Sequence, residues 1–264
     1  MKKILGILFY LAASCILSGQ NISIIEKKLD RSFQRIQYWY DARNKDSFTY
    51  DSLYAANRKF EKLLQYYTSS NPQTLRHDFK SLKKNGLSIN SSEDGKFRIY
   101  SWNTETGGTM RFYRSVFQYE SGKKVQSEVL KSNMEDDAEA MYSQINDVIS
   151  QNKKYYLAQS TAVYSSALFH HTIKVFSIEN GKLNSNAKLI KTSSGIKNEL
   201  GYELDFTATS NRENPISIEL FNTLDIQYDA KKKIISIPLI RDDSRITDKK
   251  IRYHQFKGKY FEKL

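Results

Sequence analysis

Histidine and cysteine, which often perform catalysis or bind metals, are rare in this 264-residue chain, which has four histidines and one cysteine. Its four histidines are His77, His170, His171 and His254, and none belongs to a His-Glu-x-x-His pair. The sequence also lacks a phosphate-binding glycine loop and a Gly-x-Ser-x-Gly motif. His170 and His171 are neighbours on a predicted strand, so their side chains point to opposite faces and do not share a metal ion. The sequence therefore predicts no catalytic residue, no metal and no cofactor.

The strongest candidate for a binding site is the aromatic stretch from Lys96 to Lys124. Alternation along a predicted strand places Arg98, Tyr100 and Trp102 on one face, with two further side chains opposite them on the return strand. Arginines and aromatic rings in this arrangement form a platform that stacks on and hydrogen-bonds to sugars or peptides. With the polar connecting loop included, the predicted binding residues are Arg98, Tyr100, Trp102, Asn103, Glu105, Arg111 and Tyr113.

A second interpretation of the same aromatics stays open. They can fill the core beneath the N-terminal helices, because cross-strand aromatic pairs are ordinary stabilisers of sheets. The platform interpretation requires an exposed, concave patch around Trp102. Full burial of Tyr100, Trp102 and Tyr113 would exclude it, and the commonness of aromatic pairs in sheets favours the core.

Apolar residues spaced three and four apart predict helices over 25–40 and 50–67, and a shorter third helix that ends at Asn85 and Gly86. From residue 87 the period changes to alternation, with Gly-Lys turns at Gly95, Gly122, Gly181 and Gly258 that are typical of a meander of hairpins. The pattern predicts an α+β fold, mainly antiparallel β, as an irregular propeller, a curved sheet or a sandwich. One inserted helix is predicted near 134–151, where Asn133 is a suitable cap and acidic residues follow it.

The N-terminus has the features of a signal peptide over residues 1–19. Lys2 and Lys3 precede an apolar run from Ile4 to Leu17, and small residues follow it. The run is too short for a membrane span, so no transmembrane segment is expected after cleavage. Two alternatives are an uncleaved anchor and lipidation of Cys15, although Ala12 stands where the lipidation motif has a large aliphatic residue. The expected domains are then a helical region over 20–86 and an antiparallel β domain over 87–264.

The chain is strongly basic, with a formal net charge of +12. Without Lys2 and Lys3, 39 basic residues stand against 29 acidic ones, which leaves +10. Such a surface attracts anionic partners, but the lysines are scattered along the sequence, which favours solvated charge over a dedicated site. No nucleic-acid-binding module is present, so nucleic acid is not an expected partner.

The run from Ser91 to Thr109, SSEDGKFRIYSWNTETGGT, resembles a segment of uncharacterised exported proteins of Bacteroidota. Those proteins share a D-G-K-x-R-I-Y-S-W motif followed by T-G-G-T, and they more often have Asp where this chain has Asn103. The terminal run from Phe256 to Phe261, FKGKYF, is similar to the ends of such chains. The resemblance implies export and transfers no catalytic residue.

The leading hypothesis is an exported, non-enzymatic binding or cell-envelope interaction protein, periplasmic or extracellular, whose partner is an anionic envelope polymer, a glycan or a protein. One alternative is a hydrolase of envelope polymers with His170, His171 or His254 as base, which requires a carboxylate beside one of them. Another is a structural subunit of an envelope complex, which an extended apolar surface on the helices would favour.

Overall fold

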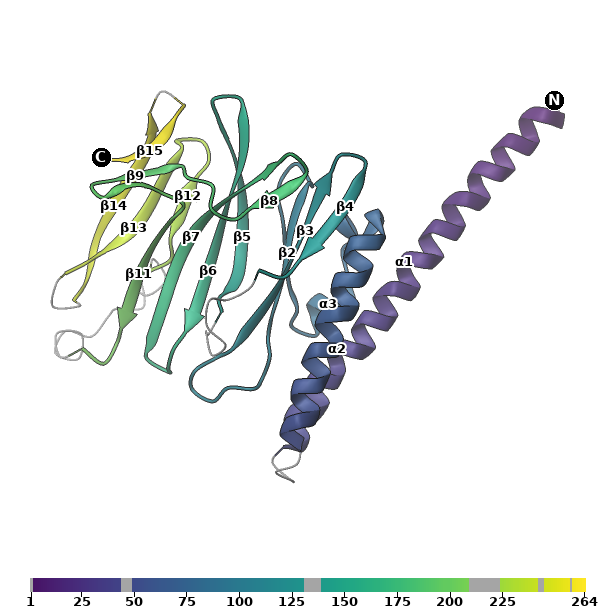
Figure 1. Ribbon diagram of the computed structural model, residues 1–264, viewed down its shortest axis with the longest axis horizontal. Coiled ribbons are helices and arrows are strands. Elements are labelled where there is room, and N and C mark those ends of the chain that lie inside the picture. The colour runs from purple at the N-terminus through teal and green to yellow at the C-terminus, as the bar shows by residue number, and fades with distance from the viewer. Residues whose placement is uncertain (1, 44–48, 131–138, 209–223, 242–244, 257) are drawn as a thin grey trace.

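The computed structural model describes residues 2–43, 49–130, 139–208, 224–241, 245–256 and 258–264, with the side chains of the first helix described from Ile22. Its elements form four layers, with a helical layer at one side and three open sheets stacked beside it (Figure 1). This arrangement confirms the predicted α+β fold with mainly antiparallel sheets. Among the expected arrangements it corresponds to a sandwich of sheets rather than a propeller.

The helical layer contains α1 (Lys2–Ala42), α2 (Thr49–Ser70), a 3-10 helix η1 (Pro72–Leu75) and α3 (Lys80–Lys84). The predicted helices over 25–40 and 50–67 lie within α1 and α2. The third helix also ends as expected, because Gly86 has a φ of +98° and its N–H donates to the carbonyl of Lys83. Within the described residues, no helix has the length and apolar character that crossing a membrane requires.

The first sheet has the order β1-β2-β3-β4 and is built from β1 (Ser88–Ser91), β2 (Phe97–Asn103), β3 (Tyr113–Ser121) and β4 (Lys124–Glu128). The second sheet has the order β11-β7-β6-β5, with the short β8 paired to β7. Its strands are β5 (Met141–Ser150), β6 (Lys153–Val163), β7 (Leu168–Glu179), β8 (Lys182–Asn184) and β11 (Glu199–Asp205). Every pairing in these two sheets is antiparallel.

The third sheet has the order β10-β9-β15-β14-β13-β12. Its strands are β9 (Ile190–Thr192), β10 (Gly195–Lys197), β12 (Gln227–Asp229), β13 (Ile234–Ile240), β14 (Ile246–Phe256) and β15 (Tyr260–Lys263). Strand β15 pairs in parallel with β9, which lies about seventy positions earlier in the chain, and Phe261 is opposite Ile190. All other pairings in this sheet are antiparallel.

The helix predicted near 134–151 is wrong over its second half, where β5 pairs with β6 from Met141–Thr161 to Ser150–Lys153. A bulge between Tyr142 and Gln144 shifts the register, so Tyr142 and Ile145 pack into the same core cluster although they are three residues apart. Val148 packs into the cluster on the other side of the sheet. A bulged strand that is buried on both faces can therefore have apolar residues at the spacing typical of a helix. Asn133 and the acidic residues after it lie outside the described residues.

The four Gly-Lys turns lie in hairpins as predicted: β1–β2, β3–β4, β7–β8 and β14–β15. Their glycines have φ values of +62° to +73°, a conformation that glycine reaches without steric cost. The β2–β3 connection differs, because neither Gly107 nor Gly108 has a positive φ and Glu105 does. Gly107 is instead required by close approach, since a Cβ there would lie 2.1 Å from the Met110 carbonyl oxygen.

Three hydrophobic clusters fill the spaces between the four layers. Tyr100 and Trp102 of β2 pack with α1 and α2 in one cluster, whereas Phe97 and Ile99 on the opposite face pack against the second sheet. The third cluster lies between the second and third sheets and includes Leu157 and Phe261. Strand β2 is thus covered on both faces, and so is the second sheet.

A carboxylate of α1 holds α3 in place. Glu26 Oε1 accepts a hydrogen bond of 2.9 Å from the backbone N–H of Ser81, in the first turn of α3, and Glu26 Oε2 lies 2.6 Å from His77 Nε2. Burial raises the pKa of the Glu26 carboxyl, but the hydrogen bonds from His77 and Ser81 outweigh this effect and hold the pKa below its usual value. The carboxylate form is therefore favoured by the fold.

The lowered pKa of Glu26 predicts an acid-sensitive contribution to stability. A depressed carboxyl pKa stabilises the fold above the pKa of the unfolded chain, about 4.3, and this stability is lost as the pH falls through the folded value. We expect Glu26→Gln to cost about 1 kcal/mol at pH 7, as for the loss of a cap, and to cost less at pH 3. Urea unfolding at both pH values measures this, and an equal cost at both would contradict the role of the charge.

Candidate binding pocket

The aromatic platform is wrong for its three β2 residues, Arg98, Tyr100 and Trp102, which lie in the core, whereas Tyr113 is half-buried. Tyr100 and Trp102 are fully buried and Arg98 is 6% exposed. The Trp102 ring packs edge-on against Phe60 of α2, with ring centroids 5.0 Å apart. The predicted alternation of β2 is right, but α1 and α2 cover the face that the platform interpretation leaves open.

The polar atoms of this buried face bind the backbone that follows α2. Arg98 Nη1 donates hydrogen bonds of 2.8 and 2.6 Å to the carbonyl oxygens of Thr74 and His77. The Tyr100 hydroxyl lies 3.0 Å from the Thr74 carbonyl oxygen and 2.8 Å from Gln118 Oε1, and burial raises its pKa to about 12. These side chains attach the helical layer to the first sheet.

The other four predicted residues are half-buried and lie at the open end of the first sheet. Asn103 ends β2 and pairs with Tyr113 at the start of β3. The expectation that Tyr113 lies opposite Arg98, Tyr100 or Trp102 is therefore wrong. Arg111 precedes β3, and its Nη1 lies 3.7 Å from Glu105 Oε2. The structure therefore brings Asn103, Glu105, Arg111 and Tyr113 together and separates them from the buried trio.

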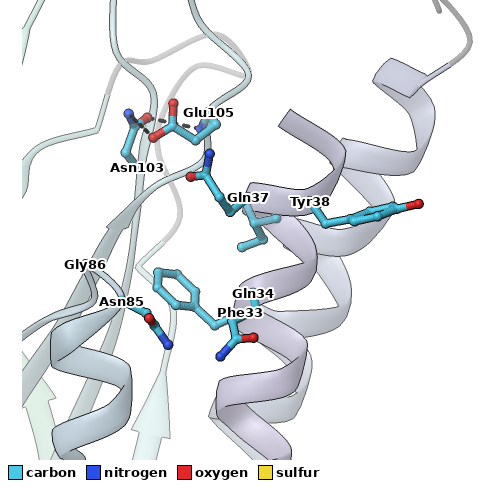
Figure 2. A pocket seen from close by; sticks show the side chains of 9 residues that line it. Phe33, Gln34, Gln37, Tyr38, Asn85, Gly86, Asn103 and Glu105 are labelled. Atoms are coloured by element: carbon cyan, nitrogen blue, oxygen red, sulfur yellow. Dashed lines mark hydrogen bonds between the residues drawn. The ribbon is translucent and has the colours of Figure 1, made fainter. Parts of the chain in front are cut away.

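Two of these residues line a pocket of about 420 Å³ between α1, the end of α3 and the β2–β3 connection. We call it the Glu105 pocket. Figure 2 shows Asn103 and Glu105 side by side at one end, Gln37 beneath them, and Phe33 reaching from α1 toward Asn85 and Gly86. The lining residues are Phe33, Gln34, Ile36, Gln37, Tyr38, Asn85, Gly86, Asn103 and Glu105.

The Glu105 side chain is fixed by a reciprocal turn with Asn103. Asn103 Nδ2 donates to Glu105 Oε1 at 2.9 Å, and the Glu105 N–H donates to Asn103 Oδ1 at 3.1 Å. Glu105 has a φ of +59°, and Arg43 Nη1 donates to its carbonyl oxygen at 3.0 Å. Backbone strain of this kind persists where the surroundings determine the conformation, and it is frequent at ligand sites.

Burial raises the pKa of the Glu105 carboxyl. The positive charges of Arg111 and Arg43 oppose this effect without cancelling it, and the negative charge of Asp41 adds to it. The side chain is 23% exposed, so it remains accessible from the pocket. Glu105 is thus a positioned carboxyl group that takes up a proton at a higher pH than an ordinary glutamate.

The amides of the pocket offer both acceptors and donors of hydrogen bonds, because each gives one N–H to a carboxylate and keeps the other. Gln34 and Asn85 each donate an amide N–H to Asp30, at 2.8 and 2.7 Å, and Gln37 donates one to Asp41 at 2.8 Å. Each amide keeps its carbonyl oxygen as an acceptor. A molecule bound here would meet these oxygens, the Glu105 carboxylate and the Phe33 ring.

Sequence reasoning missed the α1 side of this pocket. Phe33 and Ile36 belong to the apolar stripe that predicts the helix, and Gln34 and Gln37 lie beside that stripe. The sequence predicts where these residues lie on the helix. Their proximity to Asn103 and Glu105, about seventy residues further along the chain, depends on how α1 packs against the first sheet.

A histidine beside a carboxylate, which the hydrolase alternative requires within a cleft, is present at His171, and the side chain of its partner Asp225 is 74% exposed. His171 Nδ1 lies 3.2 Å from Asp225 Oδ1 and 3.1 Å from Thr161 Oγ1, and its ring stacks on Tyr202 with centroids 5.3 Å apart. Both contacts reach the same ring nitrogen, whereas a catalytic relay uses one nitrogen for the carboxylate and the other for the nucleophile. Within the described part of the chain, no three His, Cys, Asp or Glu side chains are grouped to hold a metal ion.

Comparison with known proteins finds no matching family model, no matching curated protein and no matching solved structure. The functional assignment therefore rests on the geometry and chemistry of the site.

Proposed function

We propose that this protein is an exported, non-enzymatic binding protein of the cell envelope and that the Glu105 pocket binds a sugar residue of a glycan. The observation that carries this proposal is the combination of positioned acceptors with an aromatic ring in one concave site. Sugar hydroxyls are donors that match the amide oxygens and the Glu105 carboxylate, and a sugar ring offers apolar C–H faces to Phe33. The volume lies within the usual range for small-molecule sites, about 300–1,000 Å³.

The N-terminal sequence supports the location. A charged start, an apolar run and a small-residue exit favour export to the periplasm or out of the cell, and Cys15 offers lipid anchoring as the alternative. Glycans are abundant in that environment, which agrees with a sugar as the ligand of the pocket.

The proposal predicts that Glu105→Gln weakens glycan binding. We expect a loss of about tenfold in affinity at pH 7, because the amide removes a charged acceptor while keeping the shape of the side chain. The full chain is titrated by calorimetry with oligomers of N-acetylglucosamine, glucose and mannose. Glu203→Gln, at an exposed position on β11, is the matched control and should leave the affinity unchanged.

The pH dependence gives a second measurement on the same variants. Burial raises the pKa of Glu105, so its carboxylate is protonated at a higher pH than that of an ordinary glutamate. As the pH is lowered, the wild-type affinity should therefore begin to fall above the usual glutamate range, whereas Glu105→Gln should show no such fall. Binding of none of these oligomers, or equal affinities for wild type and Glu105→Gln, would contradict the assignment.

A further inference from the structure

The outward face of the helical layer carries a second concave surface, separate from the Glu105 pocket. Two adjoining depressions of about 400 and 490 Å³ share Lys59 and Leu63, and together they follow α2 and the seam between α1 and α2. We call this surface the basic groove. Its residues are Lys28, Arg31, Ser32, Arg35, Ala55, Ala56, Arg58, Lys59, Lys62, Leu63 and Tyr66.

Six cationic side chains line the basic groove, and all six are exposed: Lys28, Arg31, Arg35, Arg58, Lys59 and Lys62. Helical spacing explains their grouping, because positions 28, 31 and 35 fall on one face of α1, and positions 58, 59 and 62 on one face of α2. The seam between two antiparallel helices then places both groups along one line. Charges that are scattered in the sequence thus form a single positive strip.

Three acidic side chains of the same helices have partners away from the groove. Glu26 binds Ser81 and His77, and Asp30 binds Gln34 and Asn85, all on the side that faces α3. Glu61 lies 3.7 Å from Arg114 on the first sheet. Among the described residues, none of the six cations forms a salt bridge with a carboxylate. The positive charge of the groove is therefore not neutralised by an ion pair, although Arg35 lies over two rings of α1, with its Cζ 4.3 Å from the Tyr38 centroid and 5.0 Å from the Trp39 centroid.

The floor and one end of the groove suit a chain that lies along it. Ala56 and Leu63 make a shallow apolar floor between the two rows of cations, and Ala55 extends the apolar surface along α2. Tyr66 is 62% exposed at one end and offers an aromatic face on which a sugar ring can stack. A row of charges beside such a floor matches a polymer that carries anionic groups at regular intervals along a backbone of rings.

A flat bilayer fits this surface less well. Helices that insert into the membrane interface present Trp, Phe and Leu side chains beside their basic residues. The exposed large hydrophobic residues of α1 and α2, within the part whose side chains are described, are Ile24 and the tyrosines Tyr38, Tyr50, Tyr54 and Tyr66.

We propose that the basic groove binds a linear acidic polysaccharide, with carboxylate or sulfate groups paired to the cations of α1 and α2 and a ring stacked on Tyr66. The groove lies on the face of α1 opposite Phe33 and Gln37, so the inference does not rest on the ligand proposed for the Glu105 pocket. The partner differs as well, since the groove recognises charge and the pocket recognises hydroxyl groups.

The test compares two variants of the full chain that lose equal charge. The groove variant combines Arg31→Gln, Arg35→Gln, Lys59→Gln and Lys62→Gln, and a milder variant has only Arg31→Gln and Lys59→Gln. The control combines Lys123→Gln, Lys124→Gln, Lys197→Gln and Lys231→Gln, all exposed positions outside the helical layer. Circular dichroism and thermal unfolding confirm the fold of each variant.

Fluorescence anisotropy with labelled polygalacturonate, dextran sulfate and neutral dextran gives the affinities, and flotation with phosphatidylglycerol vesicles tests the bilayer. We expect the wild type to bind at least one acidic polymer and not dextran, with an affinity that falls as salt rises. The groove variant should lose about tenfold or more, the milder variant less, and the control under about twofold. Glu105→Gln should have no effect.

Several results would overturn the proposal. Equal losses in the groove variant and the control would show that net charge alone attracts the polymer. Failure of the wild type to bind either acidic polymer would exclude the ligand class. Binding to vesicles alone, reduced in the groove variant, would assign the surface to a membrane instead.

Discussion

Replacing Trp102 with alanine is expected to lower the free energy of unfolding by about 3–5 kcal/mol, as for other buried tryptophans. The side chain is fully buried, and it packs edge-on against Phe60 in the cluster that joins the helical layer to the first sheet. Removing it leaves a cavity between two layers whose backbones cannot both collapse into the space. Urea unfolding followed by circular dichroism measures the loss.

Trp102→Phe is the matched control for this prediction. It keeps an aromatic ring in the cluster and removes the hydrogen bond from Trp102 Nε1 to Asn57 Oδ1, so we expect a smaller loss of about 1–2 kcal/mol. If Trp102→Ala cost less than about 1 kcal/mol, Trp102 would lie at the surface, and the aromatic platform would again be the better interpretation of β2.

Asn57→Leu is expected to cost about 2–4 kcal/mol although leucine has a similar size. Asn57 is buried in α2, where its Nδ2 donates to the carbonyl oxygens of Leu53 at 3.0 Å and Thr104 at 2.8 Å, and its Oδ1 accepts from Trp102. Leucine would leave the Trp102 N–H and the Thr104 carbonyl buried without partners. Chemical denaturation gives the cost.

A double-mutant cycle tests the mechanism of this loss. In the Trp102→Phe background no indole N–H remains to be left unpaired, so Asn57→Leu should cost about 1 kcal/mol less there than in the wild type. Strictly additive costs would show that Asn57 does not act through Trp102. Because Thr104 precedes Glu105, Asn57→Leu should also weaken ligand binding in the Glu105 pocket.

Much of the fold was predictable because its signals are local. The stripes of α1 and α2 and the Gly-Lys turns depend on residues within one or two turns of each other, and all four turns lie in hairpins. The prediction of a helix near 134–151 was wrong because it used the same local signals. A bulge at Tyr142–Gln144 and burial on both faces of β5 produce a helical period that only the neighbouring sheets explain.

The sequence predicted two residues of the candidate site but not where in the fold the site lies. Asn103 and Glu105 were among the expected binding residues and do line a pocket, whereas Arg98, Tyr100 and Trp102 share their strand and are buried. An alternating strand shows which side chains share a face. Which face is covered depends on where α1 and α2 dock, and that contact joins residues more than forty positions apart.

Spacing along the chain predicts the N-terminal helices, the hairpin turns and the alternation of β2, so these features follow from the sequence alone. Tertiary structure alone decided that both faces of β2 are covered, that Glu105 meets Phe33 and Gln37, and that scattered cations of α1 and α2 form one groove. The physical reason is that burial and local charge depend on neighbours in space, which the packing of the four layers brings together.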